Sequence, residues 1–99
     1  MFEDRFAEGV EDDLRKIRIY YRNQILDTIE EQLAHEPGVR TKNRKLLETL
    51  IPPGQAVVPI WELRVGEYRI FYDISTTESV VYVRAVRRKR RGTKTENIL

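Results

Sequence analysis

The sequence contains no cysteine and only one histidine among its 99 residues. Disulfides are therefore excluded, and a zinc site is not expected because thiolate ligands are missing and imidazole ligands are scarce. No stretch approaches the roughly 20 apolar residues that a membrane-spanning helix needs. The acidic N-terminal segment also lacks the apolar core of a signal peptide. We expect a cytoplasmic protein that contacts no membrane and uses neither a metal nor another cofactor.

The chain is short enough for one domain with a single small core, so residues 1–99 are expected to form one unit. The net charge of +2 is unevenly distributed. Ten acidic and five basic residues precede Pro37, a balance of −5, whereas six acidic and thirteen basic residues follow from Pro37 onward, a balance of +7. A half-chain with this excess of positive charge favours a polyanionic partner.

The segment from Ile60 to Ile74 is predicted to form a β-hairpin. Two runs rich in aromatic and β-branched residues are joined at Gly66-Glu67, and glycine at the first loop position suits a type II′ turn. A two-residue loop places Arg64 directly opposite Arg69. Because side chains alternate between the faces of a strand, one face becomes wholly apolar or aromatic and must pack on other elements. That face holds Trp61, Leu63, Val65, Tyr68, Ile70 and Tyr72.

The other face of the hairpin holds Glu62, Arg64, Arg69, Phe71 and Asp73. Like charges opposed across a ladder are unfavourable, so the two arginines indicate a site for an anion such as phosphate. The alternative is that the two carboxylates on this face neutralise the arginines. The pairing by itself leaves both interpretations open.

The region before Pro37 is predicted to be mainly helical, because apolar residues recur at three- or four-residue spacing. A single helix over 10–36 would be roughly 40 Å long at 1.5 Å per residue, which exceeds the width of a domain of this size. We expect a break between Ile17 and Tyr20, and hence a helical hairpin packed on the sheet. A short strand over Phe2–Phe6 precedes it. The apolar stripe consists of Val10, Leu14, Ile17, Tyr21, Ile25, Ile29 and Leu33.

A long connection, Val39–Pro59, follows the helices. Its basic run could contact phosphates, or it could be a solvated loop. Pro52-Pro53-Gly54 is expected to form a tight corner. His35, in the last helical turn, is interpreted as a capping or solvated residue rather than a catalytic one. The basic run consists of Arg40, Lys42, Arg44 and Lys45.

A third strand of the sheet is predicted from Val80 to Val86, with Val81, Val83 and Ala85 toward the core. Tyr82 and Arg84 would then share the face of the two opposed arginines. The densest charge of the chain, RRKRRGTK over residues 87–94, follows at once. We expect its first residues to lie beside the hairpin and to contact a nucleic-acid backbone, the alternative being a disordered tail.

Several of these features together resemble the RelE/ParE toxin superfamily of type II toxin–antitoxin modules. The most specific segment is LRVGEYRIFY, Leu63–Tyr72, and two other features also fit: the segment HEPGVRTKNRKL, His35–Leu46, and the last strand running into AVRRK. The resemblance implies an α+β fold in the order β-α-α-β-β-β, with an N-terminal helical hairpin on a small antiparallel sheet. It implies a cognate antitoxin as partner.

Two activities occur in this superfamily, and the resemblance allows either. RelE-like members cleave mRNA on the ribosome and so inhibit translation, whereas ParE-like members poison DNA gyrase. We expect the first, an endoribonuclease, with a gyrase inhibitor or a degenerate member that only binds its antitoxin as alternatives. Two departures weigh against a nuclease. No tyrosine or histidine lies around Thr93–Asn97, and the outward positions of the strand before the turn are Ile60 and Glu62 instead of lysines.

The resemblance implies that Arg69, the arginine of the G-x-Y-R segment, contributes to catalysis, as does a basic residue after the last strand, Lys89 or Arg88. In this chemistry the 2′-hydroxyl attacks the adjacent phosphate, whose oxygens match guanidinium forks such as that of Arg64. Arginine cannot accept the proton, so Glu62 is the only base candidate, with a salt bridge to an arginine as the alternative. The expected catalytic residues are Arg69, Arg64, Lys89 and Glu62.

Further contacts to RNA are expected from the remaining basic residues, and Tyr82 could stack on a base. We expect Arg69→Ala to abolish growth inhibition without disturbing the fold. The candidate RNA-binding residues are Arg40, Lys42, Arg44, Arg84, Arg87, Arg88, Arg90 and Arg91.

Overall fold

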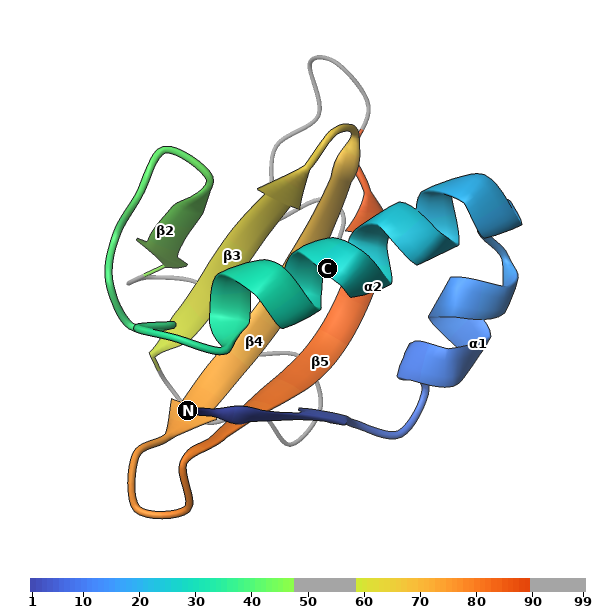
Figure 1. Ribbon diagram of the computed structural model, residues 1–99. Coiled ribbons are helices and arrows are strands. Elements are labelled where there is room, and N and C mark those ends of the chain that lie inside the picture. Colours follow the sequence, from blue (N-terminus) through green and yellow to red (C-terminus); the bar gives the residue numbers. More distant parts are fainter. Residues whose placement is uncertain (48–58, 90–99) are drawn as a thin grey trace.

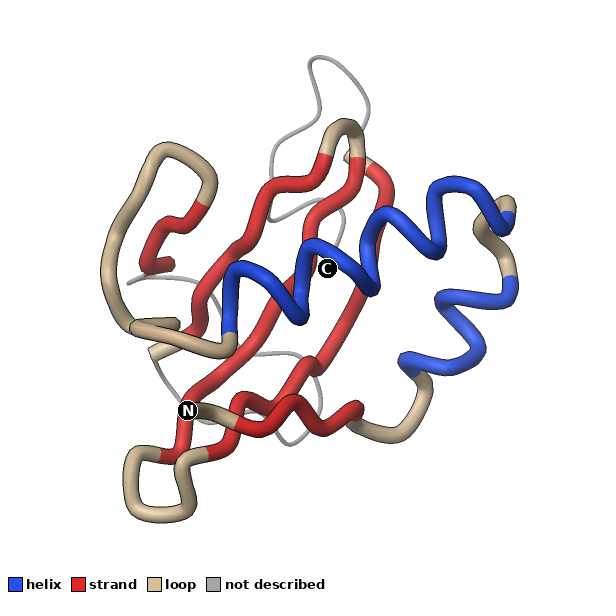
Figure 2. The backbone as a smooth tube through the Cα atoms, in the orientation of Figure 1, coloured by secondary structure: helices blue, strands red, loops and turns tan. Residues whose placement is uncertain are grey.

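A computed structural model describes residues 1–47 and 59–89 and shows an α+β domain (Figure 1). Five strands form one sheet in the order β1-β5-β4-β3-β2, and helix α2 crosses one face of it while α1 lies beside β5 (Figure 2). The elements are β1 (Glu3–Phe6), α1 (Val10–Arg15), α2 (Ile19–Leu33), β2 (Arg44–Leu47), β3 (Ile60–Val65), β4 (Tyr68–Ser75) and β5 (Val80–Arg88).

The predicted fold class is confirmed, with two differences in the sheet. Strand β1 pairs with β5 in parallel, so the sheet is mixed rather than purely antiparallel. The connection after the helices is not entirely loop, because β2 pairs antiparallel with β3 at the edge of the sheet. The expected corner at Pro52-Pro53-Gly54 lies outside the described residues. Within those residues, no helix is long and apolar enough to span a membrane.

The β3–β4 hairpin has the predicted register, with Arg64 opposite Arg69 and Trp61 opposite Tyr72. Gly66 adopts φ +58°, and Glu67 is not among the residues with positive φ. Positive φ at the first loop position alone is the pattern of a type II′ turn. The loop length and the turn type therefore follow from the glycine.

The helical region is broken into two helices, as its length predicted. Helix α1 ends at Arg15 and α2 begins at Ile19. Arg22 holds the corner, because its Nε donates to the carbonyl of Leu14 at 2.9 Å and its Nη2 donates to the carbonyl of Ile17 at 2.9 Å. The Leu14 carbonyl also accepts the backbone N–H of Ile17, so the guanidinium adds a second donor at the end of α1, where a cation is favoured.

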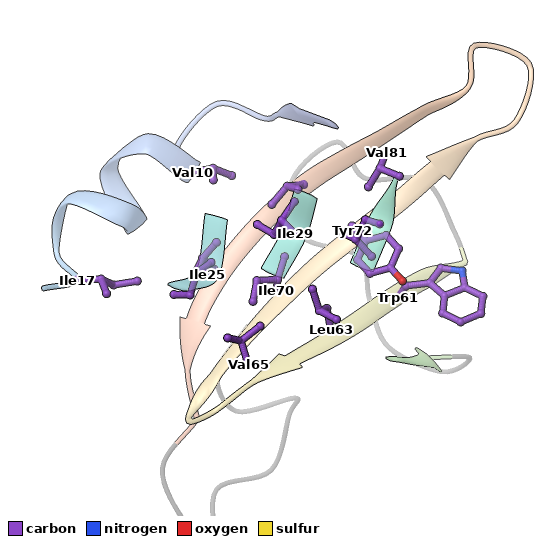
Figure 3. Packing of buried hydrophobic residues seen from close by; sticks show 13 residues of the cluster. Val10, Ile17, Ile25, Ile29, Trp61, Leu63, Val65, Ile70, Tyr72 and Val81 are labelled. Atoms are coloured by element: carbon purple, nitrogen blue, oxygen red, sulfur yellow. The ribbon is translucent and has the colours of Figure 1, made fainter. Parts of the chain in front are cut away.

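The main core lies between α2 and the sheet (Figure 3). Ile25, Ile29 and Leu33 of α2 are fully buried, as the stripe predicts, but Tyr21 of the same stripe is 43% exposed. Tyr72 is buried beneath the helix, and its hydroxyl donates to the carbonyl of Pro37 at 2.8 Å. Burial raises the pKa of Tyr72 well above its ordinary value.

The outer face of the sheet, opposite α2, carries a second and smaller apolar cluster of Ile60, Phe71 and Ala85. Ala85 was expected on the core face, and that prediction is wrong. The ladder passes from Tyr72 opposite Val83 to Phe71 opposite Ala85, so a bulge inserts Arg84 and reverses the alternation.

His35 lies beyond the last residue of α2, Leu33, and its side chain is exposed. The end of the helix is satisfied by a different cation. Arg44 is 8% exposed, and its Nη1 donates to the carbonyls of Gln32 at 3.0 Å and Glu36 at 2.8 Å. A buried guanidinium thus caps one carbonyl in the last turn of α2 and one carbonyl just beyond the helix.

Candidate functional site

A small cavity of about 140 Å³ lies on the outer face of the sheet, beside the hairpin turn. Strands β2, β3 and β4, the turn before β2 and the residue after β5 all contribute to it. Five of its side chains are cationic and one is a carboxylate, so the cavity has a marked excess of positive charge. It is lined by Lys42, Asn43, Lys45, Glu62, Arg64, Arg69 and Lys89.

The centre of the cavity is a nearly buried ion pair. Nε of Arg69 lies 3.1 Å from Oε1 of Glu62, with side-chain exposures of 11% and 6%. Nη1 of Arg69 also donates to the carbonyls of Gly66 and Tyr68, each at 2.9 Å. Contacts through Nε and Nη1 fix the orientation of the guanidinium. Glu62 therefore neutralises Arg69, as one of the two interpretations of this face required.

Arg64 is not neutralised in the same way. Its backbone N–H donates to the carbonyl of Asn43 at 2.7 Å, which anchors the chain, while its side chain is exposed. Among residues 1–47 and 59–89, no carboxylate forms an ion pair with the Arg64 guanidinium, and Asp73 pairs instead with Arg84 at 2.6 Å. The opposed arginines thus differ, one rigid and paired, the other open to an anion.

Lys89 reaches the cavity because the chain after β5 is held against the hairpin. Its backbone N–H donates to the carbonyl of Glu67 at 2.6 Å. The preceding residue, Arg88, faces the other way and pairs with the Glu67 carboxylate at 2.8 Å. The structure thus brings together all four expected catalytic residues, Glu62, Arg64, Arg69 and Lys89, with Lys42 of the candidate RNA-binding set.

The other candidate RNA-binding residues do not line this cavity. Arg44 is engaged at the end of α2, on the helical side of the sheet. Arg84 pairs with Asp73, and its guanidinium carbon lies 4.7 Å from the centre of the Tyr82 ring. Arg87 pairs with Asp13 of α1, whose Oδ2 also accepts the backbone N–H of Val86. Arg40 is exposed. Arg90 and Arg91 lie outside the described residues.

Two lining residues, Lys45 and Asn43, were not among the named candidate site residues, although Lys45 belongs to the basic run that could contact phosphates. Lys45 is placed by β2, in which it lies directly opposite Glu62. Asn43 belongs to the tight turn that closes between Thr41 and Arg44. The segment TKNRKLL contains a signal for both residues, because a polar turn precedes a short run whose side chains alternate between the two faces of a strand. The prediction missed this strand because it assigned the whole basic run to a loop.

Comparison with known proteins places the chain among toxins. The model of a family described as ParE toxin of type II toxin–antitoxin system, parDE, matches residues 5–92. An archaeal RelE–RelB complex from Pyrococcus horikoshii OT3 is similar to it with a TM-score of 0.70 and 18% identity, over 92% of this chain and 98% of that chain. No curated protein matches the sequence.

Two further solved structures share the fold. The isolated Escherichia coli RelE toxin has a TM-score of 0.66 and 18% identity, over 93% of this chain and 88% of that chain. The RelB–RelE complex from Methanococcus jannaschii has a TM-score of 0.60 and 21% identity, over 84% of this chain and 87% of that chain. The chain therefore belongs to the ParE toxin family of type II toxin–antitoxin systems, within the RelE/ParE superfamily.

Proposed function

We propose that this toxin cleaves mRNA on the ribosome and thereby inhibits translation. The observation that supports this proposal is the cavity on the outer face, in which one carboxylate, Glu62, is surrounded by five cationic side chains. Such a group can bind a phosphate, accept a proton beside it and stabilise the charge that grows on it. No metal ion is needed for these three tasks.

The proposed reaction begins when the 2′-hydroxyl of the substrate attacks the adjacent phosphorus. Glu62 takes the hydroxyl proton as the new O–P bond forms. Arg64 and Arg69 donate to the equatorial oxygens, which become more negative in the transition state. The bond to the 5′-oxygen then breaks, and the Lys89 ammonium gives that oxygen a proton. Each well-placed donor of this kind is worth about 2.7–4 kcal/mol of transition-state stabilisation.

The ion pair between Glu62 and Arg69 suits this scheme. It holds the carboxylate beside the guanidinium that binds the phosphate, so base and phosphate are positioned by one contact. Because two carbonyls of the turn fix the same guanidinium, little reorganisation is needed when substrate arrives. Because the positive charge of Arg69 is neutralised by Glu62, Arg64 supplies the net positive charge that attracts the phosphate.

We also propose a cognate antitoxin as the partner that neutralises this chain. The support is analogy. The structures from P. horikoshii and M. jannaschii are complexes of RelE with RelB, and both share this fold. An antitoxin that covers the outer-face cavity would exclude RNA from it.

A second candidate is inhibition of DNA gyrase without any chemistry. It is favoured by the family model, which is one of ParE toxins. It is also favoured by the sequence after Lys89, which contains no tyrosine or histidine that could assist proton transfer. In that case the excess charge of the cavity would serve only for binding.

One induction experiment separates the two candidates. The toxin is expressed briefly, the 5′ ends of mRNA are mapped, and translation and DNA supercoiling are followed in the same culture. Arg64→Ala is the test variant, and Arg5→Ala, an exposed arginine of β1 far from the cavity, is its matched control. New ends at codon positions that disappear only in Arg64→Ala would support cleavage. Trapped gyrase with double-strand breaks and intact mRNA would favour the second candidate.

A further inference from the structure

A second and larger cavity, of about 660 Å³, lies on the helical side of the same hairpin turn. The two cavities lie on opposite faces of the hairpin, because successive side chains of a strand point to opposite faces. Arg64, Arg69 and Lys89 face the outer cavity, whereas their chain neighbours Val65, Tyr68 and Arg88 line the larger one. A flexible chain bound at the outer cavity would therefore meet the second one by passing over the turn.

Tyr21 and Tyr68 line this larger cavity, which we call the tyrosine groove, and the Tyr20 ring contacts that of Tyr21 beside it. Tyr20 and Tyr21, in the first turn of α2, are 72% and 43% exposed. Their rings meet edge to face with centroids 5.1 Å apart, and the Tyr21 ring lies 6.1 Å from that of Tyr68. Rings with this exposure on a basic surface are the usual platform for stacking unpaired bases.

The charge of the groove is also positive. Lys16 and Arg18 line it, and the first turn of α2 contains no acidic residue. Within the part of the chain that the structure describes, neither of these two cations forms an ion pair. Glu67, at the tip of the turn, is engaged by Arg88. The uncompensated charge of the groove therefore favours a negatively charged occupant.

We propose that the tyrosine groove binds single-stranded RNA next to the nucleotide whose phosphate occupies the outer cavity. Tyr20 and Tyr21 stack on bases, and Lys16 and Arg18 hold the intervening phosphates. This inference rests on the proposed RNA-cleaving function, because the RNA strand whose phosphate occupies the outer cavity is the chain that would continue into the groove. The competing occupant, an acidic segment of a protein, is an outcome of the test.

Binding is measured by fluorescence anisotropy with the full chain and a labelled single-stranded RNA whose 2′-hydroxyls are methylated, so that it cannot be cleaved. Tyr20→Ala should weaken binding roughly 5- to 150-fold, the ratio that corresponds to ~1–3 kcal/mol of stacking per base. Tyr20→Phe should retain the affinity, because its ring still stacks. Phe6→Ala, an exposed aromatic on β1, is the matched control and should change nothing.

The salt dependence tests the cations separately. Lys16→Gln with Arg18→Gln should lower the slope of log K against log salt by about 0.7 for each phosphate of the single strand that these side chains neutralise. Arg5→Gln, an exposed cation outside the groove, should leave that slope unchanged. Circular dichroism of every variant confirms that these surface changes leave the fold intact.

The outcomes distinguish this inference from the proposed function. Ring-dependent RNA binding by a toxin that cleaves no mRNA would support the groove and reject the nuclease. Cleavage of mRNA by a toxin whose RNA affinity is indifferent to Tyr20, Lys16 and Arg18 would overturn the groove alone. Absence of RNA binding by the unmodified chain would overturn it as well. Unchanged RNA affinity with loss of antitoxin binding in Tyr20→Ala would assign the groove to a protein.

Discussion

The ion pair between Glu62 and Arg69 makes the candidate site part of the fold. Both side chains are nearly buried, and removal of Arg69 would leave a carboxylate without its cation. Breaking a buried pair in this way costs about 3–5 kcal/mol. A domain of this kind has a free energy of unfolding of roughly 5–15 kcal/mol. We therefore predict that Arg69→Ala is strongly destabilised, contrary to the expectation from sequence that it leaves the fold undisturbed.

The residues around Glu62 and Arg69 narrow the expected loss of unfolding free energy. Lys45 lies opposite Glu62 and can approach its carboxylate once Arg69 is removed, which places the loss of unfolding free energy toward the lower end of that range. Two hydrogen bonds from Arg69 to the turn carbonyls disappear in addition. The double variant Glu62→Gln with Arg69→Ala should lose less than the sum of the single variants, by about 0.5–3 kcal/mol of coupling.

Urea unfolding of the four proteins in this cycle measures both quantities, provided that the slope against urea stays constant. Arg64→Ala is the matched control. Its side chain is exposed and unpaired among the described residues, so its stability should stay within about 0.5 kcal/mol while its activity falls. Arg69→Ala with unchanged stability, or a cycle with no coupling energy, would refute the argument that this pair is a buried structural element.

Three further predictions concern the fold. Arg44→Ala removes two charged hydrogen bonds, one to a carbonyl of α2 and one to a carbonyl just beyond it, each worth about 1.5–3 kcal/mol. At roughly 4–8 °C per kcal/mol, the melting temperature should fall by more than about 10 °C, whereas Lys45→Ala, at the exposed neighbour, should not lower it. Burial and then Glu30 raise the pKa of Asp4 above its ordinary value of 3.8, so the free energy of unfolding should fall as pH rises from 3.8 through the raised folded-state pKa. Asp4→Asn should raise the melting temperature at pH 7 but not well below pH 3.8, where the carboxyl is protonated in both states. Gly66→Ala places a side chain at φ +58° and should cost about 1 kcal/mol in urea unfolding, and Gly66→Asn should cost less. Equal stability of all three proteins would contradict the positive φ at this turn position.

The hairpin could be predicted because its determinants are local. Gly66 supplies the positive φ of the turn, which fixes the loop length, and the alternating aromatic residues then fix which face is buried. The break between the helices could be predicted from length alone. The turn that results places Tyr20 and Ile19 in solvent, at 72% and 68% exposure, as their departure from the apolar stripe indicates.

The features that were missed depend on partners far away in the sequence. Strand β2 has only four residues, too few for the alternation of a strand to be recognised in the sequence, and it is stabilised by its pairing with β3. The bulge falls between Phe71 and Tyr72, two adjacent aromatic residues that give no hint of a changed register. Arg87 forms an ion pair with Asp13, which is 74 residues away in the sequence, so no local sequence pattern predicts it.

The number of basic residues in the second half of the chain overstates how many of them can bind a ligand. Arg44, Arg84, Arg87 and Arg88 all bind acceptors of their own chain, so they serve the fold before any ligand. What remains at the outer cavity is one rigid guanidinium, the open Arg64 and three lysines. This composition suits a phosphate, whose charge is the same in every nucleotide.

The size of the cavity leads to the same conclusion about selectivity. At about 140 Å³ it is well below the roughly 300–1,000 Å³ of sites that enclose whole small molecules. It can hold a charged group such as a phosphate but is too small to surround a base with its sugar. If the toxin cleaves at chosen positions in mRNA, the choice must be made where bases are contacted. The tyrosine groove and the ribosome that presents the codon are then the places where substrate is selected, and the outer cavity only performs the reaction.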